Sequence, residues 1–259
     1  AQCVDGGLEI RFLIGKSPAT MRVTLATGEP FLRVDLAVDW RERHTLLRVE
    51  NWLTTGAQTV LYGAPHGTVE RSALRDTPAA RARYEVPGAR YAVARDERGG
   101  LALFALDTYG WSARALPKGG LQIGHSLLRS TAWPDPSADA GEMRLSYAYA
   151  PFVNATTGAI ERAWEFYAKE SRVRLFQSED DGVLVVACKP AHDGRGVILR
   201  IRECDGKAGA IRLRCGARMR EVHEVDGLER PLESDVEIVS EELHGTISGY
   251  GLRSYRVLF

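Results

Sequence analysis

The chain has 259 residues, enough for one large domain or two smaller ones, each with its own hydrophobic core. Its apolar share of 44% and charged share of 26% are those of an ordinary globular protein. Lysine plus arginine and aspartate plus glutamate number 34 each, so no overall field would attract nucleic acid or an anionic membrane. Arginine outnumbers lysine, and we attribute this excess to coding bias and not to phosphate binding.

The N-terminus and the cysteines bear on where the protein resides. The sequence contains no run of about 18 apolar residues and therefore predicts no membrane span. The opening AQCVDGGLEI lacks the features of a signal peptide, and without an initiator Met the chain is interpreted as an excised or processed piece. The cysteines show no CxxC spacing, so we expect reduced thiols and a cytoplasmic protein without a disulfide framework; they are Cys3, Cys188, Cys204 and Cys215.

The dominant hydrophobic period is two. Between Leu32 and Val38 apolar residues occupy alternate positions, with Arg33 and Asp35 between them, which predicts a half-buried strand. Similar runs follow in HTLLRVENWL, TVLYG, RYAVARD, LALFALD and MRLSYAYAPF, separated by Gly, Pro or Asp. Short strands at this spacing are typical of an antiparallel sandwich or barrel.

One later segment predicts a helix. TTGAIERAWEFYAKE places Ile160, Ala163, Trp164 and Tyr167 at helical spacing. After a polar stretch, strand-like runs resume in VLVVACK, GVILRIREC, AIRLRCG, VEIVSEE and LRSYRVLF. We therefore predict an all-β protein: a large antiparallel sandwich over residues 1–174, a smaller sandwich over 175–259, and one short helix between them.

Two carboxylates stand close together in SLLRSTAWPDPSADAG, residues 126–141. Asp135 and Asp139 could share the acid and base roles of glycoside hydrolysis. However, Pro134 and Pro136 stiffen this turn, and aspartates in such loops commonly accept backbone N–H bonds. We favour the structural interpretation.

The loop YGAPHGTVER offers His66, Glu70 and Arg71 for hydrogen bonding. A His/Glu pair could transfer protons at an anomeric centre, as in a mutarotase-like epimerase. The alternative, a surface histidine in a strand connection, is commoner and is favoured here. The six histidines form no HxH or HExxH pattern, so no metal site is expected.

Aromatic residues offer a further possibility. Tyr109, Trp111 and Trp133 would stack on sugar rings if they lay exposed in a row, which would make the chain an autonomous carbohydrate-binding module. Tryptophans in a sandwich are usually core residues, and this second interpretation stays open from the sequence.

Several segments in order resemble one family. WRERHTLLRVEN, YGAPHGTVER, VPGARYAVARDERGGLALFALDTYGWS and SLLRSTAWPDPSADAGEMRLSYAYAPF look like the C-terminal region of glycoside hydrolase family 38 α-mannosidases. The later ACKPAHDGRGVILRIRE is similar to a family segment represented here by Lys189, Asp193, Gly194, Arg200 and Glu203, and VDGLERPL resembles the family's closing stretch. The resemblance covers nearly the whole chain and rests on the order of the motifs.

The resemblance implies a non-catalytic region. In that family the zinc ligands and the nucleophilic aspartate belong to an N-terminal α/β barrel, so it implies no catalytic residue, metal or cofactor here, and zinc in the missing barrel. It also implies a large mutarotase-like sandwich and a smaller one that pack against that barrel and help to wall a site for α-mannosides.

The resemblance contributes no site residue. A sugar-contacting segment of some members is shortened here to AYAPF, so the candidates for sugar contact are those drawn from the residues alone: His66, Glu70, Arg71, Tyr109 and Trp111. An apolar face left by the barrel predicts dimers or larger species.

Overall fold

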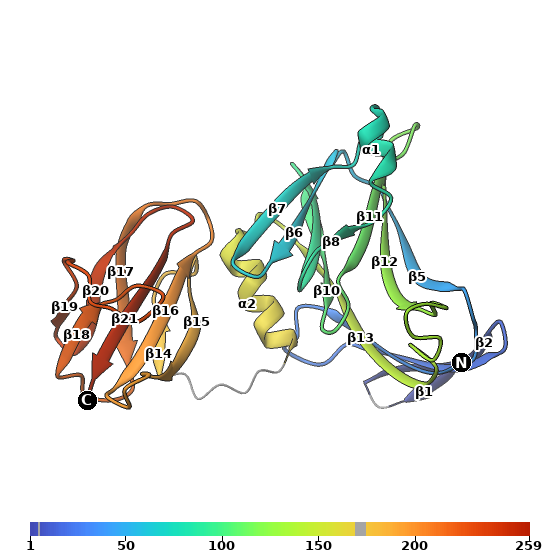
Figure 1. The fold of residues 1–259 in the computed structure, drawn as a ribbon. Coiled ribbons are helices and arrows are strands. Elements are labelled where there is room, and N and C mark those ends of the chain that lie inside the picture. Colours follow the sequence, from blue (N-terminus) through green and yellow to red (C-terminus); the bar gives the residue numbers. More distant parts are fainter. Residues whose placement is uncertain (5, 169–174) are drawn as a thin grey trace. The chain divides into compact units, whose positions relative to one another are not determined.

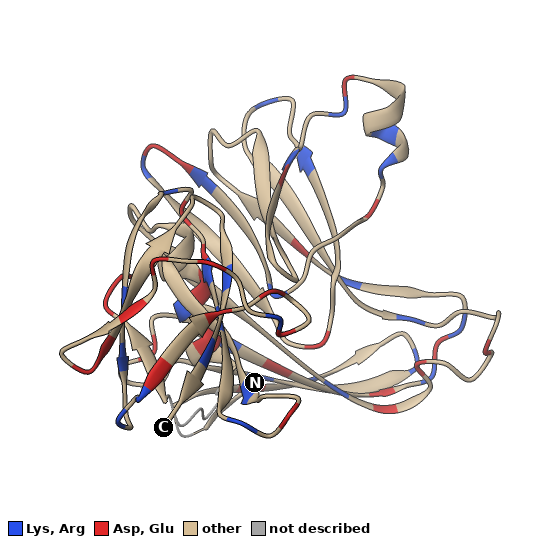
Figure 2. Cartoon of the chain, turned by 60° about the vertical axis from the view of Figure 1, so that its left-hand side comes forward, with Lys and Arg blue, Asp and Glu red and all other residues tan. Residues whose placement is uncertain are grey.

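The structure is a computed structural model that describes residues 1–4, 6–168 and 175–259, and the described residues form 21 strands and two helices. The chain divides into two compact units, Ala1–Asn154 and Ala155–Phe259 (Figure 1). Charged residues are dispersed over strands and loops along the chain (Figure 2). Neither described helix has the length and hydrophobicity that a membrane span requires.

The first unit contains a nine-stranded antiparallel sheet. Its strand order is β1-β2-β3-β4-β13-β10-β9-β6-β7, so the late strand β13 lies between early strands. The bounds are β1 Gln2–Val4, β2 Gly7–Ile14, β3 Ser17–Thr24, β4 Leu32–Trp40, β6 Thr59–Ala64, β7 Gly67–Ser72, β9 Tyr91–Asp96, β10 Gly99–Ala105 and β13 Gly141–Phe152.

A four-stranded antiparallel sheet, ordered β5-β12-β11-β8, completes this unit. Its strands are β5 Leu46–Leu53, β8 Val86–Pro87, β11 Gly110–Ala115 and β12 Leu121–Arg129. The one-turn helix α1, Pro78–Ala82, precedes β8 and begins where the Thr77 hydroxyl accepts a hydrogen bond from the Ala80 N–H at 3.1 Å.

Alternation along the strands places the core between the two sheets. On β4, Val34, Leu36 and Val38 are buried, as the period of two predicted, whereas Leu32 at the strand's start is 37% exposed. The core of this unit comprises one cluster around Trp40 and another around Trp111.

The second unit is a smaller sandwich of two four-stranded antiparallel sheets, ordered β14-β17-β20-β19 and β15-β16-β21-β18. A cluster that includes Leu199, Leu213 and Leu243 fills the space between them. The strands are β14 Phe176–Ser178, β15 Val183–Pro190, β16 Val197–Glu203, β17 Gly209–Cys215, β18 Glu221–Glu224, β19 Glu237–Val239, β20 Glu242–Ile247 and β21 Leu252–Leu258.

The predicted helix is α2, Thr157–Tyr167, and it belongs to the second unit. Its Glu161 carboxylate accepts a hydrogen bond from the Arg202 guanidinium of β16 at 2.9 Å, and both side chains are 4% exposed. The Gly158 N–H donates to the Asp205 carboxylate at 2.9 Å. These contacts attach the helix to the second unit, so the two units divide after Asn154. The predicted boundary at 174/175 placed the helix with the first unit because the sequence did not indicate against which sandwich it packs.

Candidate functional site

The segment YGAPHGTVER forms the hairpin β6–β7, with His66 exposed in its turn. Glu70 accepts a hydrogen bond from the Thr59 hydroxyl at 2.5 Å across the hairpin. Among the described residues His66 makes no hydrogen bond or ion pair with a carboxylate. Four residues of extended chain, roughly 13 Å, separate His66 from Glu70, so the hairpin does not assemble them as a proton-transfer pair.

Arg71 lies on the same hairpin, with its guanidinium carbon 5.1 Å from the centre of the Tyr62 ring. Burial raises the pKa of the Tyr62 phenol to about 12, against a smaller lowering by the Arg71 charge. The phenol therefore stays protonated near neutrality and can donate a hydrogen bond.

The candidate aromatic residues do not share an exposed row. Tyr109 is 70% exposed and Trp133 is 83% exposed, but Trp111 is fully buried. The Trp111 indole N–H donates to the Gly88 carbonyl at 2.8 Å, and its ring stacks on His125 with centres 4.1 Å apart. Trp111 thus has no free face for a sugar ring and serves the core.

His125 is a buried titratable group that the sequence analysis did not single out. Its Nε2 lies 2.6 Å from the Thr108 hydroxyl, and Tyr147 meets it edge-on with ring centres 5.8 Å apart. Burial, assisted by the Arg48 charge, lowers the pKa of His125 to about 3, so the imidazole is neutral at physiological pH. Its inward position was readable from its alternation with Leu121 and Ile123.

The two carboxylates of the 126–141 loop hold the loop together. Asp135 accepts hydrogen bonds from the Ser137 N–H at 2.9 Å and hydroxyl at 2.7 Å, which lower the pKa of its carboxyl. Asp139 accepts from the Arg129 N–H at 2.8 Å and has φ 59°. Each carboxylate is engaged with its own part of the chain, as the structural interpretation predicted.

The outer face of the small sheet carries a polar network. Arg114 donates to the Gln122 amide oxygen at 2.6 Å, and the Gln122 amide N–H donates to Glu50 at 2.9 Å. Trp52, paired with Gln122 in the strand register, is 66% exposed beside this network. Trp52 was missed because HTLLRVENWL was interpreted only as a strand, although alternation placed Trp52 on the same outer face as Glu50.

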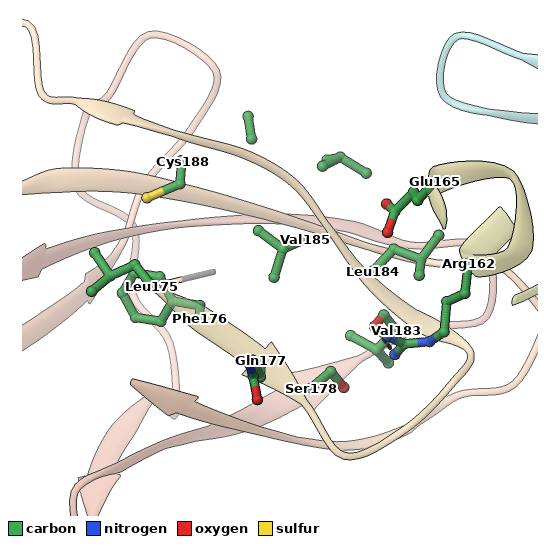
Figure 3. A pocket seen from close by; sticks show the side chains of 12 residues that line it. Arg162, Glu165, Leu175, Phe176, Gln177, Ser178, Val183, Leu184, Val185 and Cys188 are labelled. Carbon is green, nitrogen blue, oxygen red and sulfur yellow. Dashed lines mark hydrogen bonds between the residues drawn. The ribbon is translucent and has the colours of Figure 1, made fainter. Parts of the chain in front are cut away.

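The second unit has a cavity of about 640 Å³ bordered by α2, β14 and β15 (Figure 3). Its wall includes Leu175, Phe176 and Val185. The Arg162 guanidinium is already engaged, because it donates to the Asp180 carbonyl at 2.8 Å. Glu165 of α2 and Cys188 of β15 also line the cavity.

The described residues contain no group of three His, Cys, Asp or Glu side chains placed to hold a metal ion. In the part of the chain that the structure describes, the candidate groups are therefore carboxylates that stabilise their own loop, one buried histidine and several exposed aromatic residues.

Comparison with known families decides the assignment. The model of the "Glycosyl hydrolases family 38 C-terminal domain" matches residues 4–137, and that of the "Glycosyl hydrolases family 38 C-terminal beta sandwich domain" matches residues 182–255. The chain belongs to glycosyl hydrolase family 38. Each match lies within one of the two compact units, so both sandwiches of this family 38 chain have counterparts in the family.

Individual relatives are longer proteins. The chain is 29% identical over 194 residues to alpha-mannosidase G of Dictyostelium discoideum, covering 68% of this chain and 17% of that protein. It is 28% identical over 248 residues to human alpha-mannosidase 2C1, covering 88% and 23%, respectively. The family 38 chain thus spans about a quarter or less of these relatives.

Solved structures share the fold. An alpha-mannosidase from Enterococcus faecalis V583 superposes with a TM-score of 0.74 at 13% identity, covering 93% of this chain and 29% of that one. A second family 38 protein from Enterococcus faecalis gives a TM-score of 0.73 at 13% identity, covering 93% and 30%. The all-β sandwich fold is therefore confirmed across nearly the whole chain.

Proposed function

We propose that this family 38 region is a supporting, non-catalytic part of an α-mannosidase and packs against a catalytic domain of the same chain. The observation that carries the proposal is that both compact units match C-terminal domains of the family. The relatives are larger proteins, and the family 38 region fills only 17–23% of the two named above.

The candidate groups of this chain support a structural role. Asp135 and Asp139 accept hydrogen bonds within their loop, and Glu70 bonds across its hairpin. In the intact enzyme the substrate would be an α-mannoside and zinc would sit in the catalytic domain. The described residues of this chain offer no matching set of zinc ligands.

Exposed apolar side chains on the first unit are suited to contact with the catalytic domain. Leu13 is 70% exposed, Leu25 62% and Trp52 66%. His66 and Tyr109, which are also exposed, remain candidates for the rim of the mannoside pocket. A cytoplasmic location and self-association of the isolated chain belong to the same proposal.

The test compares three proteins on an aryl α-mannoside: this chain alone, the longer protein, and the two parts expressed separately and mixed. We expect hydrolysis by the longer protein, restored hydrolysis in the mixture, and none above background by this chain. A matched control is Asp135→Asn in the longer protein, which should keep its activity. Hydrolysis by the chain alone at the rate of the longer protein would refute the proposal, as would a catalytic part that is fully active and stable without it.

A further inference from the structure

A small cavity of about 220 Å³ lies in the first unit between hairpin β6–β7, the segment around α1 and strand β11. Its wall includes Arg71 from β7, Arg75 and Arg83 from either side of α1, and Ser112 from β11. Three arginines from one short stretch of chain, residues 71–83, therefore line the same small volume, with strand β11 on another side. Basic residues lie on and beside α1 (Figure 2).

The three arginines of the cavity wall have no carboxylate partner. Within the described residues, the guanidinium groups of Arg71, Arg75 and Arg83 make no hydrogen bond or ion pair with a carboxylate. Some other arginines are paired, as Arg253 is with Glu224 at 2.7 Å. Arg75 instead lies over the Tyr84 ring, 5.6 Å from its centre. Stacking on a ring face leaves the N–H edges of a guanidinium available for a ligand.

The charge of the wall is strongly positive for a protein with no net charge. Asp76 is the one carboxylate among the described residues that line the cavity, so three guanidinium groups against one carboxylate leave a formal charge of +2. A phosphate group carries about −1.5 to −2 charges near neutrality, which matches this excess.

Arg71 contributes its charge to this wall and no free N–H that the structure shows. Its Nη1 atom has no contact with solvent and no hydrogen-bond partner among the described residues, and its guanidinium carbon lies 5.1 Å from the centre of the Tyr62 ring. Hydrogen bonds to a ligand would therefore come mainly from Arg75 and Arg83, which also line the cavity.

We propose that this cavity binds a phosphate group, either inorganic phosphate or the phosphate of a monoester such as a hexose phosphate. The planar guanidinium fork donates pairs of parallel hydrogen bonds to phosphate oxygens, which favours arginine over lysine in such sites. The volume suits a phosphate with a few waters, since a water occupies about 30 Å³ of liquid, whereas larger ligands fill sites of roughly 300–1,000 Å³.

The experiment is calorimetric titration of the full chain at neutral pH and fixed ionic strength, with inorganic phosphate and, separately, glucose 6-phosphate. We compare the parent with the double variant Arg75→Gln/Arg83→Gln. The matched control is Arg144→Gln, which removes an exposed arginine of β13. We expect one saturable site, an affinity at least about tenfold lower in the double variant, and no change in the control, because charge-assisted hydrogen bonds are lost only in the former.

The two ligands distinguish the source of the phosphate. Equal affinities would mean that the cavity holds the phosphate group alone, and tighter binding of glucose 6-phosphate would mean that the cavity mouth also contacts the sugar; both support the proposal. Absence of saturable binding for both ligands would overturn it, as would equal competition by chloride or unchanged binding in the double variant. If that variant does not fold, Arg75→Lys/Arg83→Lys keeps the charge and should still weaken binding through loss of the paired hydrogen bonds.

Discussion

Replacing His125 with phenylalanine should change how the stability of the first unit depends on pH. The buried imidazole, stacked on Trp111 and bonded to the Thr108 hydroxyl, has a pKa lowered to about 3, whereas an unfolded histidine titrates near 6.5. Between these values the unfolded state binds a proton that the folded state excludes. Stability is therefore fully present above pH 6.5 and is lost progressively as the pH falls towards 3.

The magnitude follows from the separation of the two pKa values. A difference of 3.5 pKa units corresponds to a total of about 5 kcal/mol, reached only at strongly acidic pH. Between about pH 7 and pH 5 the expected loss from His125 alone is about 2 kcal/mol. A phenylalanine keeps the aromatic stack but does not titrate, and leaves Thr108 without this partner, which costs about 0.5–1.5 kcal/mol at neutral pH.

The assay is urea unfolding followed by tryptophan fluorescence at several pH values between about 7 and 5. The first unit holds four of the five tryptophans, so the signal reports mainly on it. Carboxylates titrate equally in both proteins, so the difference between parent and His125→Phe isolates the histidine. His66→Gln, an exposed histidine of the same unit, is the control and should follow the parent. Parallel pH dependences in the parent and His125→Phe would refute the reasoning.

Two further predictions concern buried side chains. Glu161→Ala should lower the free energy of unfolding of the second unit by about 3–5 kcal/mol, because it removes the carboxylate that pairs with the buried Arg202 guanidinium. Glu161→Leu/Arg202→Met should lower it much less, and equal losses in urea unfolding would contradict the argument. Trp111→Ala should lower the free energy of unfolding of the first unit by about 3–5 kcal/mol, because it leaves a cavity in the core. Tyr109→Ala, at an exposed position, should change it by no more than about 0.5 kcal/mol. Similar shifts in melting temperature for both variants would show that Trp111 is not a core residue.

The fold class was predictable because alternation of polar and apolar residues is strong in the central strands. Val34, Leu36 and Val38 face the core as their spacing indicated. Weaker patterns failed. Strand β12 was not among the predicted strands, although alternation runs through Leu121, Ile123 and His125. Helix α1 has five residues, too few for a helical period to be detected.

The candidate site was less predictable, because exposure depends on which sheet face a residue occupies. Tyr109 and Trp111 stand two positions apart, yet Tyr109 precedes strand β11 and is exposed, whereas Trp111 lies within the strand and is buried in the core. The loop carboxylates could be assigned correctly, because Asx turns depend on neighbours in sequence, such as Asp135 on Ser137. The distance between His66 and Glu70 depends on the extended chain between them, because positions four apart come together on a helix but not on a strand.

The arginines show why a total composition and a local site lead to different conclusions. The balanced total charge argued against attraction of nucleic acid or an anionic membrane, and that argument holds for long-range fields, which depend on the sum of charges. Binding of a single phosphate depends on the charges within a few ångströms and on which of them are already paired. Some arginines here are paired with a carboxylate, as Arg33 is with Glu29 at 3.0 Å. Arg71, Arg75 and Arg83 line one small cavity together with a single carboxylate, that of Asp76. This local excess of positive charge is not visible in the total charge of the chain, which is zero.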